Sequence, residues 1–144
     1  DRQLADTHTC IDHVKPNGTS HQQHKCIVDG SAHAVFNGKI IVRPHAQRTN
    51  SSQSSRNLLL SKTAQIDTKP QLEIFADDVK CAHGATVGQL DPEEIFYLKS
   101  RGLSELSARN LLTFAFGAEI ISRISIPSLR QQLEQAVLNQ TQSN

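Results

Sequence analysis

The composition of the chain changes sharply near Leu90, and this change constrains the fold more than any other feature. Before Leu90 the chain is rich in Thr, Ser, His, Asn, Val and Ile, and Asn-Gly or Asp-Gly pairs at 17–18, 29–30 and 37–38 predict tight turns. After Leu90 it is rich in Leu, Ala, Glu, Gln and Arg, which favour helices. We therefore expect a mostly β region over residues 1–90 and a small helical domain over residues 91–144.

Short stretches of alternating or β-branched residues predict several strands before Leu90. If residues 6–12 are extended, their odd- and even-numbered side chains occupy opposite faces. The other strand candidates are residues 25–28, 34–36, 39–43, 57–60 and 71–75. Short strands separated by turns are compatible with a sandwich, a meander or a β-helix.

A polar run at residues 49–56 bears on this choice. Its sequence is Thr-Asn-Ser-Ser-Gln-Ser-Ser-Arg, with hardly any apolar atoms to bury. In stacked parallel strands such side chains can hydrogen-bond from one strand to the next, which favours a β-helix. A solvated loop is equally compatible with this composition, and no strict repeat of short period decides between the two.

Three helices are predicted after Leu90. Asp91 is a suitable N-cap, and a proline and two glutamates follow it, so a helix should run to about Ser100 and end before Gly102. Ser104 caps a second, longer helix that Pro127 should end, and a third helix follows. The apolar stripe of the second helix comprises Leu106, Leu111, Ala115, Ala118 and Ile121 or Ser122.

Charge, cysteine content and hydropathy argue against several functional classes. Fifteen Lys and Arg residues oppose fourteen Asp and Glu, a net charge of +1, which gives no electrostatic case for a nucleic-acid or membrane partner. The longest apolar runs are too short to span a bilayer, so we expect a soluble protein. Three cysteines, an odd number, argue against a disulfide framework and for a reducing compartment. The chain begins at Asp1 and has no Met, which we interpret as a fragment.

Histidines and cysteines near the N-terminus support a first alternative function, a protein with its own metal site. The candidate zinc or iron ligands are His8, Cys10, His21, His24 and Cys26. Their spacing does not match a paired Cys-x-x-Cys pattern.

A second alternative is a carbohydrate-acting β-helix enzyme, in which adjacent carboxylates such as Asp77 and Asp78 would supply acid and base chemistry.

Cys81 and His83 are a separate pair. They are two residues apart and would project from the same face of an extended segment. A thiolate and a neutral imidazole are both ligands for iron, as in mixed Cys/His clusters. Taken alone, the pair is also compatible with a buried cysteine and a structural histidine.

The segment around this pair resembles a known family. Residues 71–88, with Asp-Asp-Val-Lys-Cys-Ala-His-Gly at 77–84, are similar to the C-terminal core of the SufB/SufD family of iron–sulfur cluster assembly, and most of all to its SufD branch. Residues 94–103 match the helical hairpin that follows in that family. Upstream, residues 34–38, 57–60 and 67–70 fit the same pattern.

The resemblance implies a right-handed parallel β-helix, whose C-terminal coils would be residues 1–90, followed by the helical domain. It implies a non-enzymatic scaffold in a complex with SufB and with SufC, an ABC-type ATPase that hydrolyses ATP. The helical tail would dock SufC, and the end of the β-helix would meet SufB. We expect a cytoplasmic location, or the plastid stroma in a plastid-bearing eukaryote, and a homodimer is a further expectation for the isolated chain.

Carried over residue by residue, the cysteine and histidine of the family's SufB interface fall on Cys81 and His83. The resemblance implies that His83 is a ligand to the nascent iron–sulfur cluster, opposite a cysteine of SufB. It also implies that the thiol of Cys81 is buried in the interface and is uncovered when ATP drives SufC dimerisation. The cluster would be bound transiently in the complex, with no catalytic residue in this chain and no cofactor in the isolated fragment.

Overall fold

The computed structural model describes residues 2–142, with side chains to residue 139. The strands are β1 (Leu4–His13), β2 (Thr19–Val28), β3 (His33–Val42), β4 (Asn50–Leu59), β5 (Gln65–Ile74) and β6 (Lys80–Gln89). The helices are α1 (Pro92–Ser100), α2 (Glu105–Ile121) and α3 (Pro127–Gln142). The chain divides into a strand unit that ends at Gly88 and a helical unit that begins at Gln89. The predicted fold class, mostly strands followed by helices, is confirmed.

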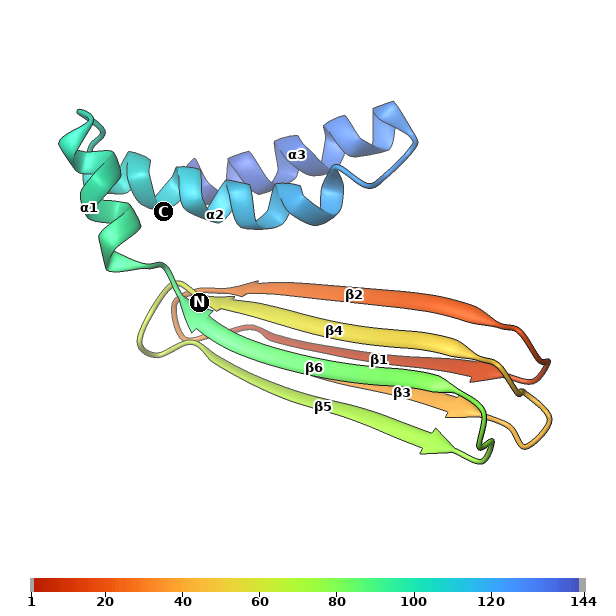
Figure 1. The fold of residues 1–144 in the computed structure, drawn as a ribbon. Helices are drawn as coiled ribbons and strands as arrows, with labels where there is room; N and C mark the ends of the chain where they lie inside the picture. The colour runs from red at the N-terminus through yellow and green to blue at the C-terminus, as the bar shows by residue number, and fades with distance from the viewer. Residues whose placement is uncertain (1, 143–144) are drawn as a thin grey trace. The chain divides into compact units, whose positions relative to one another are not determined.

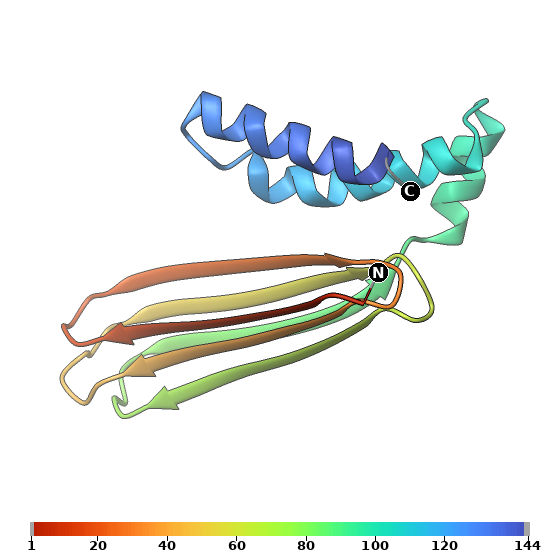
Figure 2. The ribbon, with the colours of Figure 1, turned by 180° about the vertical axis from the view of Figure 1, so that it is seen from behind.

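The strands form two parallel sheets whose members alternate along the chain (Figure 1). One sheet has the order β1–β3–β5 and the other the order β2–β4–β6, so each strand pairs with the strand two places later. Leu4 pairs with His33, His33 with Gln65, and Thr19 with Asn50. The view from behind shows the same two layers (Figure 2). Since paired residues face the same way, side chains form rows that cross all three strands of a sheet.

The polar run at 49–56 forms most of β4 and faces the interior of the strand unit. Four of its side chains are almost completely buried, at 1–2% exposure: Thr49, Ser51, Gln53 and Ser55. The Oγ atom of Ser51 lies 2.7 Å from Oγ of Ser20 in the neighbouring strand β2. The prediction that these side chains hydrogen-bond between stacked strands is therefore confirmed, and the loop alternative is wrong.

Two apolar clusters lie at either end of β3, between the sheets. One consists of Val28, Ala34 and Ala64, and the other of Ile40, Val42, Ala46 and Ala76. Between them, Phe36 is fully buried, and its ring stacks on the imidazole of His24 with centroids 3.9 Å apart and planes inclined by 11°. The core is thus small and mixed, with rows of polar side chains between two apolar ends.

Two of the three predicted turns are confirmed, and the third is wrong. Asn17 and Gly30 have positive φ, 62° and 61°, in the connections after β1 and β2. The pair at 37–38 lies in the middle of β3, so residues 34–36 and 39–43 belong to one strand that ends at Val42. The glycine is needed for space, because a Cβ atom at Gly38 would lie 2.7 Å from Cδ of Gln53 in the facing sheet.

Local capping sets the starts of the first two helices. The carboxylate of Asp91 accepts a hydrogen bond from the N–H of Glu93 at 2.8 Å, and the hydroxyl of Ser104 accepts one from the N–H of Ser107 at 3.1 Å. Gly102, with φ 95°, follows α1 as predicted. None of the described helices is long and apolar enough to cross a membrane.

The end of α2 and its buried face differ from the prediction. The helix ends at Ile121, and Pro127 is the first residue of α3, a position that tolerates proline because the N–H it lacks would be unpaired there. Ile121 is buried as predicted, together with Ala108, Thr113 and Gly117. Leu106 and Leu111, which were predicted to face the core, are exposed. α3 packs against α2, and small side chains at a contact let two helices approach closely.

Candidate functional site

Strand β6 carries the predicted site residues and is the last strand of its sheet. Its neighbour is β4, and the N–H of Lys80 donates to the carbonyl of Thr49 at 2.9 Å. β6 is exposed from Ala82 to Gln89. Together with β5, the last strand of the other sheet, it forms what we call the open end of the strand unit. An outer strand exposes backbone N–H and C=O groups that another chain can pair with.

Cys81 lies at the start of this strand and points toward the core. Its side chain is half-buried and packs against the cluster formed by Ile40, Val42, Ala46 and Ala76. Burial raises the pKa of the Cys81 thiol, and a hydrogen bond from the backbone of Ser51 offsets part of that rise. A thiol in this environment loses its proton less readily than an exposed one, and a protonated thiol is a poor metal ligand.

His83 is two residues further along β6 and is exposed. Because strand residues alternate between faces, its side chain leaves the same face as Cys81, with the two Cα atoms about 6.6 Å apart. The structure thus places an accessible imidazole beside a half-buried thiol at the open end. A site for iron built on these two donors needs further ligands, since tetrahedral sites take four.

The five residues of the metal-site alternative lie on β1 and β2, which belong to different sheets. His8, Cys10 and His21 are on the outer faces of these strands, whereas His24 and Cys26 are on the inner face of β2. His8 lies 2.9 Å from the carboxylate of Asp6, His24 stacks on Phe36, and Cys26 packs in the cluster around Ala34. Burial lowers the pKa of His24 and raises the pKa of Cys26, so both are held neutral. Within residues 2–142, no three His, Cys, Asp or Glu side chains come together as metal ligands would.

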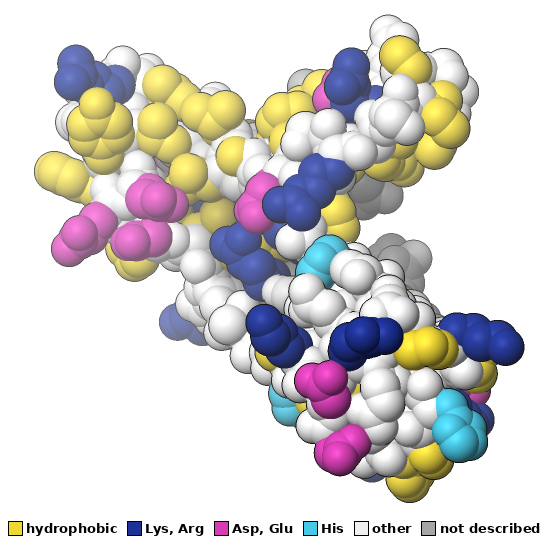
Figure 3. All heavy atoms as spheres, turned by 45° about the vertical axis from the view of Figure 1, so that its right-hand side comes forward, with side chains coloured by type: hydrophobic (Ala, Val, Ile, Leu, Met, Phe, Trp, Pro, Cys, Tyr) yellow, Lys and Arg dark blue, Asp and Glu magenta, His cyan; other side chains and the backbone are white. Residues whose placement is uncertain are grey.

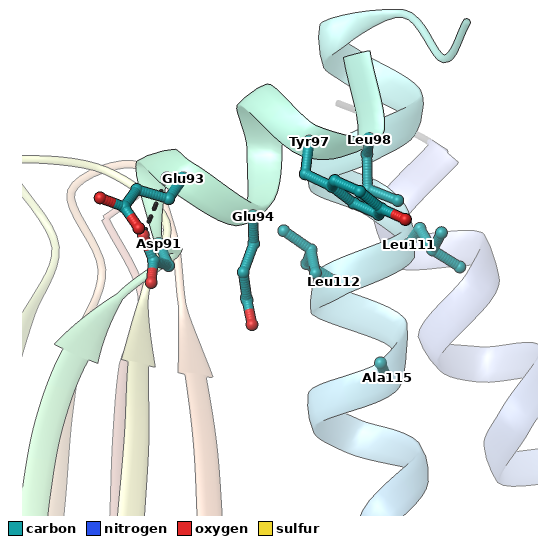
Figure 4. Close-up of a pocket in the computed structure, with 8 residues that line it drawn as sticks. All are labelled: Asp91, Glu93, Glu94, Tyr97, Leu98, Leu111, Leu112 and Ala115. Atoms are coloured by element: carbon teal, nitrogen blue, oxygen red, sulfur yellow. Dashed lines mark hydrogen bonds between the residues drawn. The ribbon is translucent and has the colours of Figure 1, made fainter. Parts of the chain in front are cut away.

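The helical unit contains a groove of about 480 Å³ between α1 and α2. Its lining combines apolar and acidic side chains: Asp91, Glu93, Glu94, Tyr97, Leu98, Leu111, Leu112 and Ala115. Figure 4 shows Tyr97 and Leu98 next to Leu111, with Glu94 directed along the side of Leu112. In Figure 3, apolar side chains lie exposed over the helical unit, with acidic side chains beside them. This groove suits an apolar segment with basic neighbours.

Sequence reasoning missed two of these features. The first is the acidic side of the groove: Asp91 and the two glutamates after it indicate a helix start, but three carboxylates in four residues also give a local negative charge. The second feature is Gln53, hidden in the polar run. It is 2% exposed, and its Oε1 is the buried side-chain polar atom that lacks a hydrogen-bond partner in the described part of the chain. Only its place in the sheet distinguishes it from its polar neighbours.

Comparison with known proteins gives consistent matches along the chain. The family model described as "SUF system FeS cluster assembly, SufBD core domain" matches residues 1–116. An iron–sulfur cluster assembly SufBD family protein of Synechocystis is 53% identical over 94% of this chain, and the iron–sulfur cluster assembly protein SufD of Escherichia coli is 48% identical over 91%. The chloroplastic protein ABCI7 of Arabidopsis thaliana is 43% identical over 90%.

These matches cover the strand unit that carries Cys81 and His83 and extend into the helices. The chain spans 30%, 31% and 28% of the lengths of the three relatives. The family model covers well over half of the chain, so the resemblance predicted from the segment around the Cys-x-His pair is confirmed. The chain belongs to the SufBD family of iron–sulfur cluster assembly proteins.

Proposed function

We propose that this chain is the C-terminal part of a non-enzymatic scaffold subunit of the SufD type, which acts with SufB and the ATPase SufC in iron–sulfur cluster assembly. The observation that carries the proposal is the accessible imidazole of His83 beside the half-buried thiol of Cys81, on the last strand of a SufBD-family chain. The nascent cluster is the cargo of the complex and is held only transiently.

His83 is proposed as a ligand to the nascent cluster, opposite a cysteine from SufB. Its exposure at the open end supports this role, because a ligand shared between chains must be reachable from outside. A site divided between two chains can hold a cluster while it forms and release it when the chains move. A closed four-cysteine site within one chain would retain it.

Cys81 is proposed to be a thiol that becomes reactive only when the interface opens. Its packing against the apolar cluster and the raised pKa both support a protonated, protected state at rest. Movement driven by ATP-dependent dimerisation of SufC would expose the sulfur, lower its pKa and make it a better nucleophile and ligand.

The proposed architecture of the complete protein is a right-handed parallel β-helix that ends within residues 1–90, followed by a helical domain over 91–144. Two observations support it: strands alternate between two parallel sheets, and each pairs with the strand two places later. The outer strands at the open end would then meet SufB.

The helical domain is proposed to dock SufC through the groove between α1 and α2. Exposed apolar side chains, including Tyr97 and Leu111, support a protein partner, and the carboxylates beside them favour a partner segment with Lys or Arg. ATP hydrolysis is assigned to SufC. We place the complex in the cytoplasm, or in the plastid stroma of plastid-bearing eukaryotes, and a homodimer is proposed for the chain in the absence of SufB.

The test is a His83→Ala substitution in the complete protein, co-expressed with SufB and SufC. We expect the complex to form normally, because the side chain is exposed, while cluster assembly and cluster-dependent growth are lost. His21→Ala is the matched control, since His21 is also an exposed strand histidine but lies on β2. If His83→Ala supported growth as well as the parent, the ligand role would be refuted.

A further inference from the structure

A chain of hydrogen-bonded amide side chains, one half-buried and one buried, links strands β1, β2 and β4. The Nε2 of Gln22 donates to the hydroxyl of Thr9 at 2.8 Å, and the Nε2 of Gln53 donates to Oε1 of Gln22 at 2.6 Å. Gln22 and Gln53 are neighbours in the register of β2 and β4. Hydrogen-bond donation therefore runs in one direction, from the amide of Gln53 to that of Gln22 and from Gln22 to Thr9 in β1.

This chain of hydrogen bonds stops at Oε1 of Gln53. That atom is buried and has no hydrogen-bond partner within the described residues. The oxygen and nitrogen of an amide diverge from Cδ, and the nitrogen is directed back to β2. Oε1 is therefore turned toward the other neighbour of β4, which is β6.

The register of β4 and β6 places His83 at this position. The N–H of Asn50 donates to the carbonyl of Gly18, and the residue that follows Gly18, Thr19, is the pairing partner of Asn50. In the same way the N–H of Lys80 donates to the carbonyl of Thr49, which pairs Lys80 with Asn50. Three residues further along each strand, Gln53 is paired with His83. Paired residues of parallel strands face the same side, about 4.8 Å apart.

We propose that Gln53 is a positioning residue for His83: its Oε1 accepts a hydrogen bond from one ring N–H of His83 when the imidazole turns inward over the open end. This rests on the proposed role of His83 as a cluster ligand. One ring nitrogen is then fixed as the protonated one, and the other carries its lone pair outward, toward the cluster. Such partners set the tautomer and ring direction of metal-binding histidines.

The other buried side chains of the polar run at 49–56 do not share this unpaired acceptor. Thr49, Ser51 and Ser55 are as buried as Gln53, but each hydroxyl has a hydrogen-bond partner within the strand unit. Gln53 combines a hydrogen-bond chain from β1 and β2 with an unpaired acceptor, in register with the residue proposed to bind the cluster. Its long side chain also requires the glycine at position 38 opposite it.

The test compares Gln53→Met, Gln53→Glu and Gln22→Met in the complete protein, assembled with SufB and SufC. Met has nearly the shape of Gln without its acceptor, whereas Glu keeps an oxygen facing His83. With Glu, the Gln22 amide can rotate to donate, because the Thr9 hydroxyl can donate as well as accept. Gln22→Met breaks the amide chain but leaves the Gln53 oxygen in place, so it controls for stability.

We expect cluster assembly to fall about 10- to 100-fold in Gln53→Met, as for other partners of metal-binding histidines, and to be largely restored in Gln53→Glu and retained in Gln22→Met. Nitrogen-15 spectra of the histidine rings supply a second measurement, with the His83 signals identified by their loss in His83→Ala. The parent should show one fixed tautomer for His83, and Gln53→Met should show averaged ring-nitrogen signals.

Three results would overturn the inference: normal assembly in Gln53→Met, equal loss in Gln22→Met, or failure of Gln53→Glu to restore assembly. These outcomes are distinct from failure of the proposed function. If His83→Ala itself assembled clusters normally, the ligand role of His83 would be refuted. If His83→Ala did not assemble clusters while Gln53→Met matched the parent, only the positioning role of Gln53 would be refuted.

Discussion

Gly38 gives the sharpest test of how the strand unit is packed. A Gly38→Ala substitution adds one methyl group in the middle of β3, facing the interior. That methyl carbon would lie 2.7 Å from Cδ of Gln53 and 2.8 Å from Cζ of Phe36. Real Cβ atoms do not approach other atoms so closely, and both neighbours are buried, so both side chains or the backbone of β3 must shift.

The expected cost follows from what moves. Overpacking of a core by one methyl group costs about 1 to 3 kcal/mol. Displacing the Gln53 amide also breaks its 2.6 Å hydrogen bond to Gln22, and a buried polar group left unpaired costs about 1 to 3 kcal/mol more. Ala has a lower chain entropy than Gly in the unfolded state, which offsets about 0.4 to 1 kcal/mol of this destabilisation. The net expectation is a loss of about 1 to 5.6 kcal/mol in the free energy of unfolding.

The measurement is urea unfolding of the complete protein, followed by circular dichroism, with hydrogen exchange to locate the effect in β3 and β4. Gly88→Ala is the matched control, because Gly88 is also a strand glycine but a Cβ there meets nothing within 4 Å. It should be neutral or slightly stabilising. Adding Gln53→Ser to Gly38→Ala should recover part of the loss, since the shorter side chain removes the collision. Equal stability of Gly38→Ala and Gly88→Ala would refute the reasoning.

Two further predictions concern pH and docking. Burial lowers the pKa of His24, so the unfolded chain binds its proton more readily, and stability should rise with pH through the range below about 6.5. His24→Phe, which keeps a ring against Phe36, should flatten that rise in urea midpoints measured across this range, and an unchanged slope would contradict the assignment. In the helical unit, Leu111→Asp should weaken capture of SufC by the complete protein, whereas Leu129→Asp, at a leucine of similar exposure outside the groove, should not. Equal effects of the two substitutions would contradict docking through the groove.

Local signals were sufficient for much of the helical unit. Asp91 and Ser104 cap their helices through hydrogen bonds to residues two and three positions ahead, so the sequence alone places these starts. The end of α2 and its buried face were not predictable in the same way. Burial of Ala108 and Gly117 rather than Leu111 depends on where α3 packs, which no local pattern specifies.

In the strand unit, too, some features could be predicted from local sequence and others could not. Alternation along an extended segment is a local property, so the placement of Cys81 and His83 on one face followed from their spacing. The polar run and the pair at 37–38 could not be interpreted locally. Whether serines at 51 and 55 are solvated or buried depends on strands about thirty residues away in sequence, and Gly38 looks like a turn residue until Gln53 is seen to fill the space beside it.

The sequence by itself determined the break between strands and helices, the helix starts, the family and the two donor side chains on β6. The tertiary structure decided which of those donors is buried, where the acidic groove lies, and which buried amide is paired with His83. The physical reason is the distance along the sequence over which each effect acts. Capping and strand alternation act within a few residues, whereas burial and register arise only when distant segments pack together. The proposed site depends on both, since β6 supplies the ligands and β4 supplies the residue that would orient one of them.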